Sequence, residues 1–100
     1  MDMNVKISLC MIVKNEEDVI ARCLDSVSRC VDEIIIADTG SSDRTKEICR
    51  DFTDKIFDFE WTDDFSAARN FSFSKATGDY LMWLGADEGV YSENIGLLKV

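Results

Sequence analysis

The chain has no histidine and no proline, and its apolar runs are short. Without histidine, and with no CxxC spacing among its four cysteines, it lacks the ligand pattern of a zinc site. The clearest apolar run, residues 7–13, is too short for a membrane span of about 20 residues, and the charged residues that follow it do not fit a secretory signal. The absence of proline fits a chain made almost wholly of regular elements.

Positive charge is also scarce, with 11 Lys and Arg against 20 Asp and Glu and a net charge of -9. This balance excludes nucleic acid as the expected partner, because such binding needs a basic footprint. An anionic ligand such as a diphosphate would need a divalent cation or a well-placed Arg or Lys. The cysteines have the character of reduced structural residues, which predicts a cytoplasmic protein; they are Cys10, Cys23, Cys30 and Cys49.

Alternating segments predict an α/β fold with a mostly parallel sheet and helices on both faces, as in Rossmann-like domains. Near-continuous apolar runs indicate buried strands, and apolar stripes of helical period separate them. The expected strands are 7–13, 33–38, 55–59 and 80–84, and the expected helices are 19–27 after a cap at Asn15, 43–52, 64–76 before a C′ glycine at Gly78, and 92–100. The whole chain, 1–100, is expected to be a single partial domain, and its end inside the last expected helix favours truncation.

Polar and acidic residues follow every expected strand. Ligands of open α/β sheets bind beyond the carboxyl ends of the strands, and clustered carboxylates there suit a hard divalent cation. Neither GxxxxGK[ST] nor GxGxxG is present, so a direct phosphate loop is not expected. The residues at this edge are Lys14, Asn15 and Glu16, then Asp38, Thr39 and Gly40, then Glu60, Trp61, Asp63 and Asp64, and finally Gly85, Asp87 and Glu88. Arg69 is the positive side chain available to an anion there.

These residues also have purely structural interpretations. Asn15 can cap a helix, and Asp63 and Asp64 can cap the next one or contact a ligand. Capping is the favoured role for the segment 41–43, and core or rim packing is the favoured role for Trp61 and Trp83. Asp38, Arg69, Asp87 and Glu88 can likewise be ordinary polar residues of strand ends and loops.

Four ordered segments resemble the motifs of family 2 inverting glycosyltransferases with the GT-A fold. The first is ISLCMIVKNEE at 7–17, the second is DTGSSDRT at 38–45, and the third is FSAARN at 65–70. The fourth, YLMWLGADE at 80–88, stands where the family usually has L-D-A-D-E or L-D-A-D-D. The similarity spans nearly the whole chain, in order and at fitting spacing.

The resemblance implies a nucleoside-diphosphate sugar as ligand, most often a UDP-sugar, with Mg²⁺ or Mn²⁺ as cofactor. It places Lys14, Asn15 and Glu16 at the nucleoside pocket. Asp38 would hydrogen-bond the base, and Arg69 would lie near the base or the phosphates. Ala86 is counted among the substrate-binding residues, and Asp87 is the residue expected to hold the metal.

Two departures from the family limit the expected activity. Gly85 replaces an acid of the DxD motif, which should weaken metal-assisted binding by about a few kcal/mol. The catalytic base of the family lies downstream in the acceptor half, and no residue here can be assigned to it. We therefore expect this chain to be the donor-binding portion of a glycosyltransferase and to be inactive by itself. Whether the chain is an enzyme is left open. The alternative is a non-catalytic nucleotide-binding, metal-binding or protein-interaction module, with self-association through an exposed sheet edge.

Overall fold

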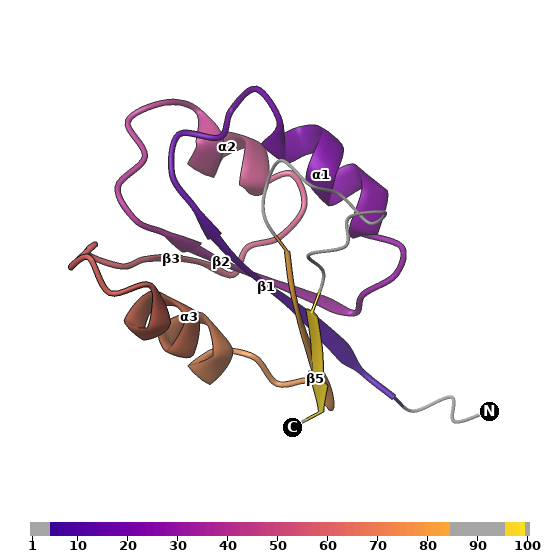
Figure 1. Cartoon of the computed structure of the whole chain (residues 1–100). Helices are drawn as coiled ribbons and strands as arrows, with labels where there is room; N and C mark the ends of the chain where they lie inside the picture. Colours follow the sequence, from indigo (N-terminus) through magenta and orange to yellow (C-terminus); the bar gives the residue numbers. More distant parts are fainter. Residues whose placement is uncertain (1–4, 85–95, 100) are drawn as a thin grey trace.

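The computed structural model describes residues 5–84 and 96–99, and its strands form one sheet (Figure 1). In this part of the chain the strands are β1 (Ile7–Val13), β2 (Glu33–Asp38), β3 (Ile56–Asp58), β4 (Tyr80–Trp83) and β5 (Gly96–Lys99). The helices are α1 (Ile20–Val27), α2 (Thr45–Cys49) and α3 (Phe65–Ser74). The strand order is β3-β2-β1-β4-β5, in which the first four are mutually parallel and β5 is antiparallel. The predicted mostly parallel α/β sheet is confirmed.

Helices cover both faces of the sheet, as predicted. Figure 1 shows α1 and α2 on one side and α3 on the other. Alternate residues of β1 and β2 explain this arrangement, because successive side chains of a strand point to opposite faces. Leu9, Met11 and Ile36 belong to the larger buried cluster with α1 and α2, whereas Cys10 and Ile35 pack with residues of the α3 segment.

The helix α1 has the predicted apolar stripe but not the predicted cap. Its buried residues are Ile20, Cys23, Leu24 and Val27. Val19 occupies the N-cap position without a side-chain bond, and no acid lies in the first turn. The capping prediction for Asn15 was wrong because its side chain is used elsewhere: Oδ1 accepts a hydrogen bond from the backbone N–H of Ser42 at 2.8 Å.

The helix α3 begins as predicted and ends differently. Asp64 caps it, accepting a hydrogen bond from the N–H of Ala67 at 3.1 Å. Gly78, however, is not its C′ residue, because the helix ends at Ser74. A Cβ atom on Gly78 would lie 2.5 Å from Ser8 Oγ, so glycine is required there by the close approach of β1.

The end of the sheet corrects another prediction. Gly96–Lys99 is a strand paired with β4, not part of the helix expected over 92–100. The free edge of β4 offers backbone donors and acceptors, and pairing with them outweighs the helical pattern of the local sequence. The inference of truncation from a chain end within a helix therefore has no basis. The elements α2 and β3 are also shorter than expected, at five and three residues.

The amino ends of the strands are joined by a buried carboxylate. Glu33, 5% exposed, accepts hydrogen bonds from Ser8 Oγ at 2.6 Å and from the Thr77 N–H at 2.8 Å, and it pairs with Lys55 and Lys6. Burial by itself would raise the pKa of Glu33, but Lys55 and the hydrogen bonds outweigh burial and lower the pKa to about 2. This end of the sheet is therefore closed by its own side chains. None of the helices described is long and apolar enough to cross a membrane.

Candidate functional site

The sheet has a topological switch point between β1 and β4. From β1 the chain moves outward to β2 and β3 through α1 and α2, and it then returns through α3 to place β4 on the other side of β1. The helix that follows β1 (α1) and the helix that precedes β4 (α3) therefore lie over opposite faces of the sheet (Figure 1). Open α/β sheets bind their ligands in the crevice that this reversal creates at the carboxyl ends of the strands.

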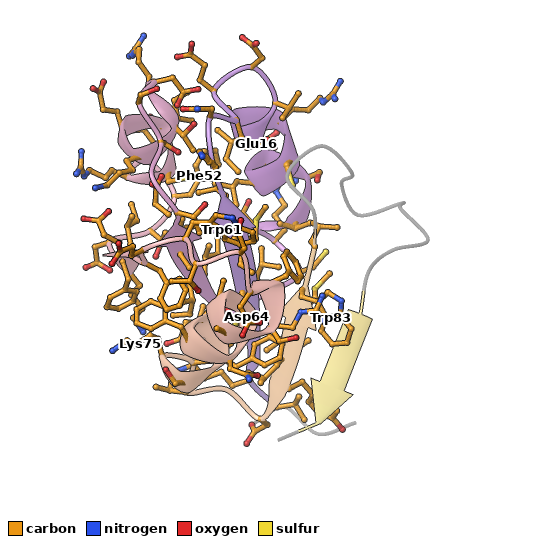
Figure 2. The ribbon with its side chains drawn as sticks, turned by 60° about the vertical axis from the view of Figure 1, so that its left-hand side comes forward. Glu16, Phe52, Trp61, Asp64, Lys75 and Trp83 are labelled. Carbon is orange, nitrogen blue, oxygen red and sulfur yellow. The ribbon has the colours of Figure 1, made fainter. Side chains whose placement is uncertain are left out.

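A cleft of about 280 Å³ lies at this edge. Figure 2 shows Trp61 between the loop that carries Glu16 and the start of α3. Two aromatic rings of the cleft are exposed to solvent, Trp61 at 39% and Phe65 at 52%. Sequence reasoning assigned Trp61 to packing; its position in a loop between acidic residues was the signal for an exposed ring. The lining residues are Ile12, Val13, Lys14, Glu16, Thr39, Trp61 and Phe65.

Two of the three predicted nucleoside-pocket residues line this cleft, and the third supports it. Lys14 and Glu16 are lining residues. Asn15 has a left-handed backbone with φ of 51°, its N–H donates to Ser41 Oγ at 2.9 Å, and its Oδ1 holds the next loop. Asn15 therefore joins the loops that follow β1 and β2.

Further hydrogen bonds join the same two loops. The Glu16 N–H donates to Oγ1 of the fully buried Thr45 at 2.7 Å, and the Glu17 N–H donates to Asp43 Oδ2 at 3.2 Å. Although loss of hydration opposes it, hydrogen bonding from Thr45 holds the pKa of Asp43 below its usual value. The interpretation of the segment 41–43 as structural agrees with these contacts, which tie the loop after β2 to the loop after β1.

Asp38 lies at the end of β2, buried beneath this edge. It is 2% exposed, and its Oδ1 accepts hydrogen bonds from the N–H groups of Gly40 at 2.8 Å and Ser41 at 2.7 Å. Its Oδ2 is the one buried side-chain oxygen or nitrogen without a hydrogen-bond partner among the residues that the structure describes. Asp38 does not itself line the cleft. It pairs in register with Val13 and precedes Thr39, and both of these residues line the cleft.

The two oxygens of Asp38 thus differ in their environment. An unsatisfied buried polar group costs about 1–3 kcal/mol, and more when it is charged. The structure keeps this carboxylate in place through Oδ1 and leaves Oδ2 buried without a hydrogen-bond partner among the described residues. Burial raises the pKa of the Cys49 thiol to about 11, and the nearby charge of Asp38 adds to this effect.

Arg69 lies on α3 with its guanidinium in contact with two aromatic rings. Its Cζ atom is 5.0 Å from the ring centroid of Phe65 and 5.5 Å from that of Trp83, the last residue of β4. It forms no ion pair with any residue in the ranges described, whereas Lys46 pairs with Asp58 at 2.6 Å. The structure thus brings this cation to the β4 side of the switch point.

The predicted metal residue cannot be placed in this geometry. Gly85, Ala86, Asp87 and Glu88 lie outside the described residues. Within 5–84 and 96–99, no group of three or more cysteine and acidic side chains could hold a metal ion. These residues alone therefore do not form a divalent-cation site.

Comparison with known proteins gives one family and a consistent set of relatives. The model of glycosyl transferase family 2 matches residues 8–98. A TPR repeat-containing protein of Synechococcus elongatus is 49% identical over 88 residues, which cover 88% of this chain and 22% of that protein. The SPbeta prophage-derived glycosyltransferase SunS of Bacillus subtilis is 40% identical, over 86% of this chain and 21% of its own length.

Solved structures show the same fold. Glucosyl-3-phosphoglycerate synthase from Mycobacterium tuberculosis in complex with UDP has a TM-score of 0.72 at 24% identity, over 84% of this chain and 34% of that one. The same synthase in complex with Mn²⁺ and UDP-glucose also has a TM-score of 0.72, at 22% identity, over 86% of this chain and 36% of that one. The likeness identifies a GT-A-like α/β fold. The chain spans 22% and 21% of the two curated relatives named above.

Proposed function

The chain belongs to glycosyl transferase family 2, and from this membership we propose that it binds the nucleotide part of a nucleoside-diphosphate sugar at the carboxyl edge of its sheet. The donor nucleotide of the proposal is UDP. UDP and UDP-glucose are the ligands of the structurally similar synthase. The similarity of fold supports UDP as the ligand to test, but the binding itself was seen in the synthase and not in this chain.

The observation that carries the proposal is the unpartnered Oδ2 of Asp38. Uracil presents a ring N–H between its two carbonyl groups, and this donor would satisfy the buried acceptor. A hydrogen bond to a charged group contributes about 1.5–3 kcal/mol. The proposal therefore assigns Asp38 to recognition of the base, while its Oδ1 continues to hold the loop of Gly40 and Ser41.

The cleft supports a nucleoside in this place. Its volume of about 280 Å³ suits a base and its ribose but not an entire nucleotide sugar. Under the proposal Lys14 and Glu16 contact the nucleoside from the loop after β1, and Asn15 fixes that loop through Ser41 and Ser42. The diphosphate then extends toward the carboxyl end of β4, where Arg69 supplies positive charge.

A divalent cation is part of the proposal. In a chain with a net charge of -9, a bound Mg²⁺ or Mn²⁺ would neutralise the diphosphate. The synthase with the similar fold was crystallised with either ion. The residue proposed to hold it is Asp87, with Ala86 beside the substrate, and Gly85 is expected to weaken the site.

Sugar transfer requires more than donor binding. An acceptor hydroxyl must lose a proton to a general base as it attacks the anomeric carbon, and no residue of this chain is assigned to that role. The proposal for these 100 residues is therefore donor binding without transfer.

Calorimetric titration of UDP, with and without Mn²⁺, tests the proposal in the chain and in a Gly85→Asp variant. We expect binding that depends on Mn²⁺ and is at least about tenfold tighter in the variant, which corresponds to about 1.4 kcal/mol. Orthophosphate at equal concentration is the control for a non-specific anion. If UDP binds to neither protein under any of these conditions, the proposed function is wrong.

A further inference from the structure

The guanidinium of Arg69 contacts two aromatic rings from separate elements. Phe65 lies one helical turn earlier on α3, so its ring shares a face of the helix with Arg69. Trp83 belongs to β4, next to β1 in the sheet. The cation is half-buried and forms no ion pair with any side chain that the structure describes, although acidic residues outnumber basic ones by 20 to 11.

We propose that Phe65 and Trp83 are positioning residues, which hold the guanidinium of Arg69 ready for the donor nucleotide. The inference rests on the proposed function and assigns roles that the family resemblance does not. A free arginine side chain has many rotamers, and ordering them on binding opposes affinity. Contacts with two rings restrict those rotamers before the ligand arrives, and the negative faces of the rings stabilise the cation without neutralising it.

The choice of rings rather than a carboxylate has a consequence for binding. A salt bridge would hold Arg69 equally well, but a ligand would then have to displace the acid. A ring leaves the N–H donors at the edge of the guanidinium plane able to bind a phosphate or carbonyl oxygen. Because Trp83 is the last residue of β4, it also fixes the position of Arg69 relative to the switch point.

The same helix carries a matched control. Lys75 lies 5.2 Å from the ring centroids of both Phe57 and Phe71, which pack edge to face, so it too is a cation in contact with two rings. Figure 2 shows Lys75 and Trp83 on opposite sides of α3, and Lys75 is the C-cap residue, at the other end of the helix from Asp64. Loss of the Phe71 ring therefore removes an equivalent contact away from the cleft.

The test measures UDP affinity by calorimetry in Trp83→Leu, Trp83→Phe and the control Phe71→Leu. We expect Trp83→Leu to weaken binding about fivefold, Trp83→Phe to remain within about twofold, and Phe71→Leu to leave affinity unchanged. Phe65→Ala removes a ring that is 52% exposed and is the second variant if the strand substitution fails to fold. It should weaken binding about threefold.

An Arg69→Met background separates positioning from general damage. The Trp83→Leu loss should disappear when Arg69 is absent, because this ring acts through Arg69. The Phe65→Ala loss should shrink but not vanish, because Phe65 also lines the cleft. Equal losses in both backgrounds would overturn the inference, as would unchanged affinity in the ring variants. Absence of UDP binding by the unaltered chain would instead overturn the proposed function, together with the inference that depends on it.

Discussion

Replacement of Asp38 by asparagine distinguishes the two oxygens of the carboxylate. The amide oxygen of asparagine can accept the hydrogen bonds from Gly40 and Ser41 that Oδ1 accepts now. The amide NH₂ then takes the place of Oδ2, the atom without a partner. The substitution therefore keeps the loop and changes an acceptor into a donor at the position proposed to meet the base.

The magnitude follows from these contacts. Loss of a hydrogen bond from the uracil N–H to a carboxylate removes about 1.5–3 kcal/mol, so UDP should bind about 10–150-fold more weakly. Stability should change by less than about 1 kcal/mol, because weaker bonds to the loop are offset by relief of a buried charge. A variant that folds as well as the parent but binds poorly is the expected result.

The ligand series makes this prediction specific. Cytosine has a ring nitrogen acceptor where uracil has the N–H, so Asp38→Asn should bind CDP better than UDP, and the parent should prefer UDP. Asp58→Asn is the matched control, since Asp58 pairs in register with Asp38 at the end of β3 but is exposed and bound to Lys46. Unchanged UDP affinity in Asp38→Asn, or an unchanged ratio of UDP to CDP affinity, would refute the reasoning.

Three further substitutions or treatments test the fold around the site. Glu33→Gln should lower the free energy of unfolding by about 3 kcal/mol. Because the pKa of Glu33 is lowered to about 2, its contribution to folding stability is present above about pH 4.5 and is lost as the pH falls toward 2. Denaturant titrations across this range should show that the free energy of unfolding depends less on pH in the variant than in the parent. An equal pH dependence in both proteins would contradict a stabilising role for the ionised Glu33. Gly78→Ala should cost about 1–3 kcal/mol through the contact of its Cβ with β1, so an unaltered melting temperature would be evidence against that contact. Burial, together with the charge of Glu33, raises the pKa of the Cys10 thiol to about 12, and burial raises that of Cys49 to about 11; a thiol reagent at pH 8 should modify the exposed Cys30 first, and peptide mass spectrometry that finds early modification of either buried thiol would contradict this.

Local patterns were sufficient for the elements that bury their own apolar residues. The runs that became β1 and β2 were predicted with their observed bounds, because a parallel strand buried on both faces is nearly all apolar. The stripe of α1 was equally clear. The positions of Lys14, Glu16 and Asp38 at the carboxyl edge followed from the sheet alone, since Lys14 and Glu16 lie in the loop after β1 and Asp38 is the last residue of β2.

The errors lie where distant segments meet. Asn15 looked like a helix cap, but Ser42, 27 residues later, takes its side chain. Gly78 looked like a helix terminator, but the close approach of Ser8, 70 residues earlier, explains it. The strand Gly96–Lys99 depends on the free edge of β4. These contacts join residues far apart in the sequence, so no local periodicity of apolar residues can predict them.

The most direct test of the central claim is to locate UDP binding by NMR in the ¹⁵N-labelled chain with Mn²⁺ replaced by Mg²⁺. We expect shifts of the Lys14 and Glu16 amides, of the Gly40 and Ser41 amides bonded to Asp38, and of the Trp61 indole N–H, which donates to Asp63 at 3.0 Å in the structure. Shifts confined to the opposite edge of the sheet, around Glu33, or no shifts at saturating UDP, would contradict it.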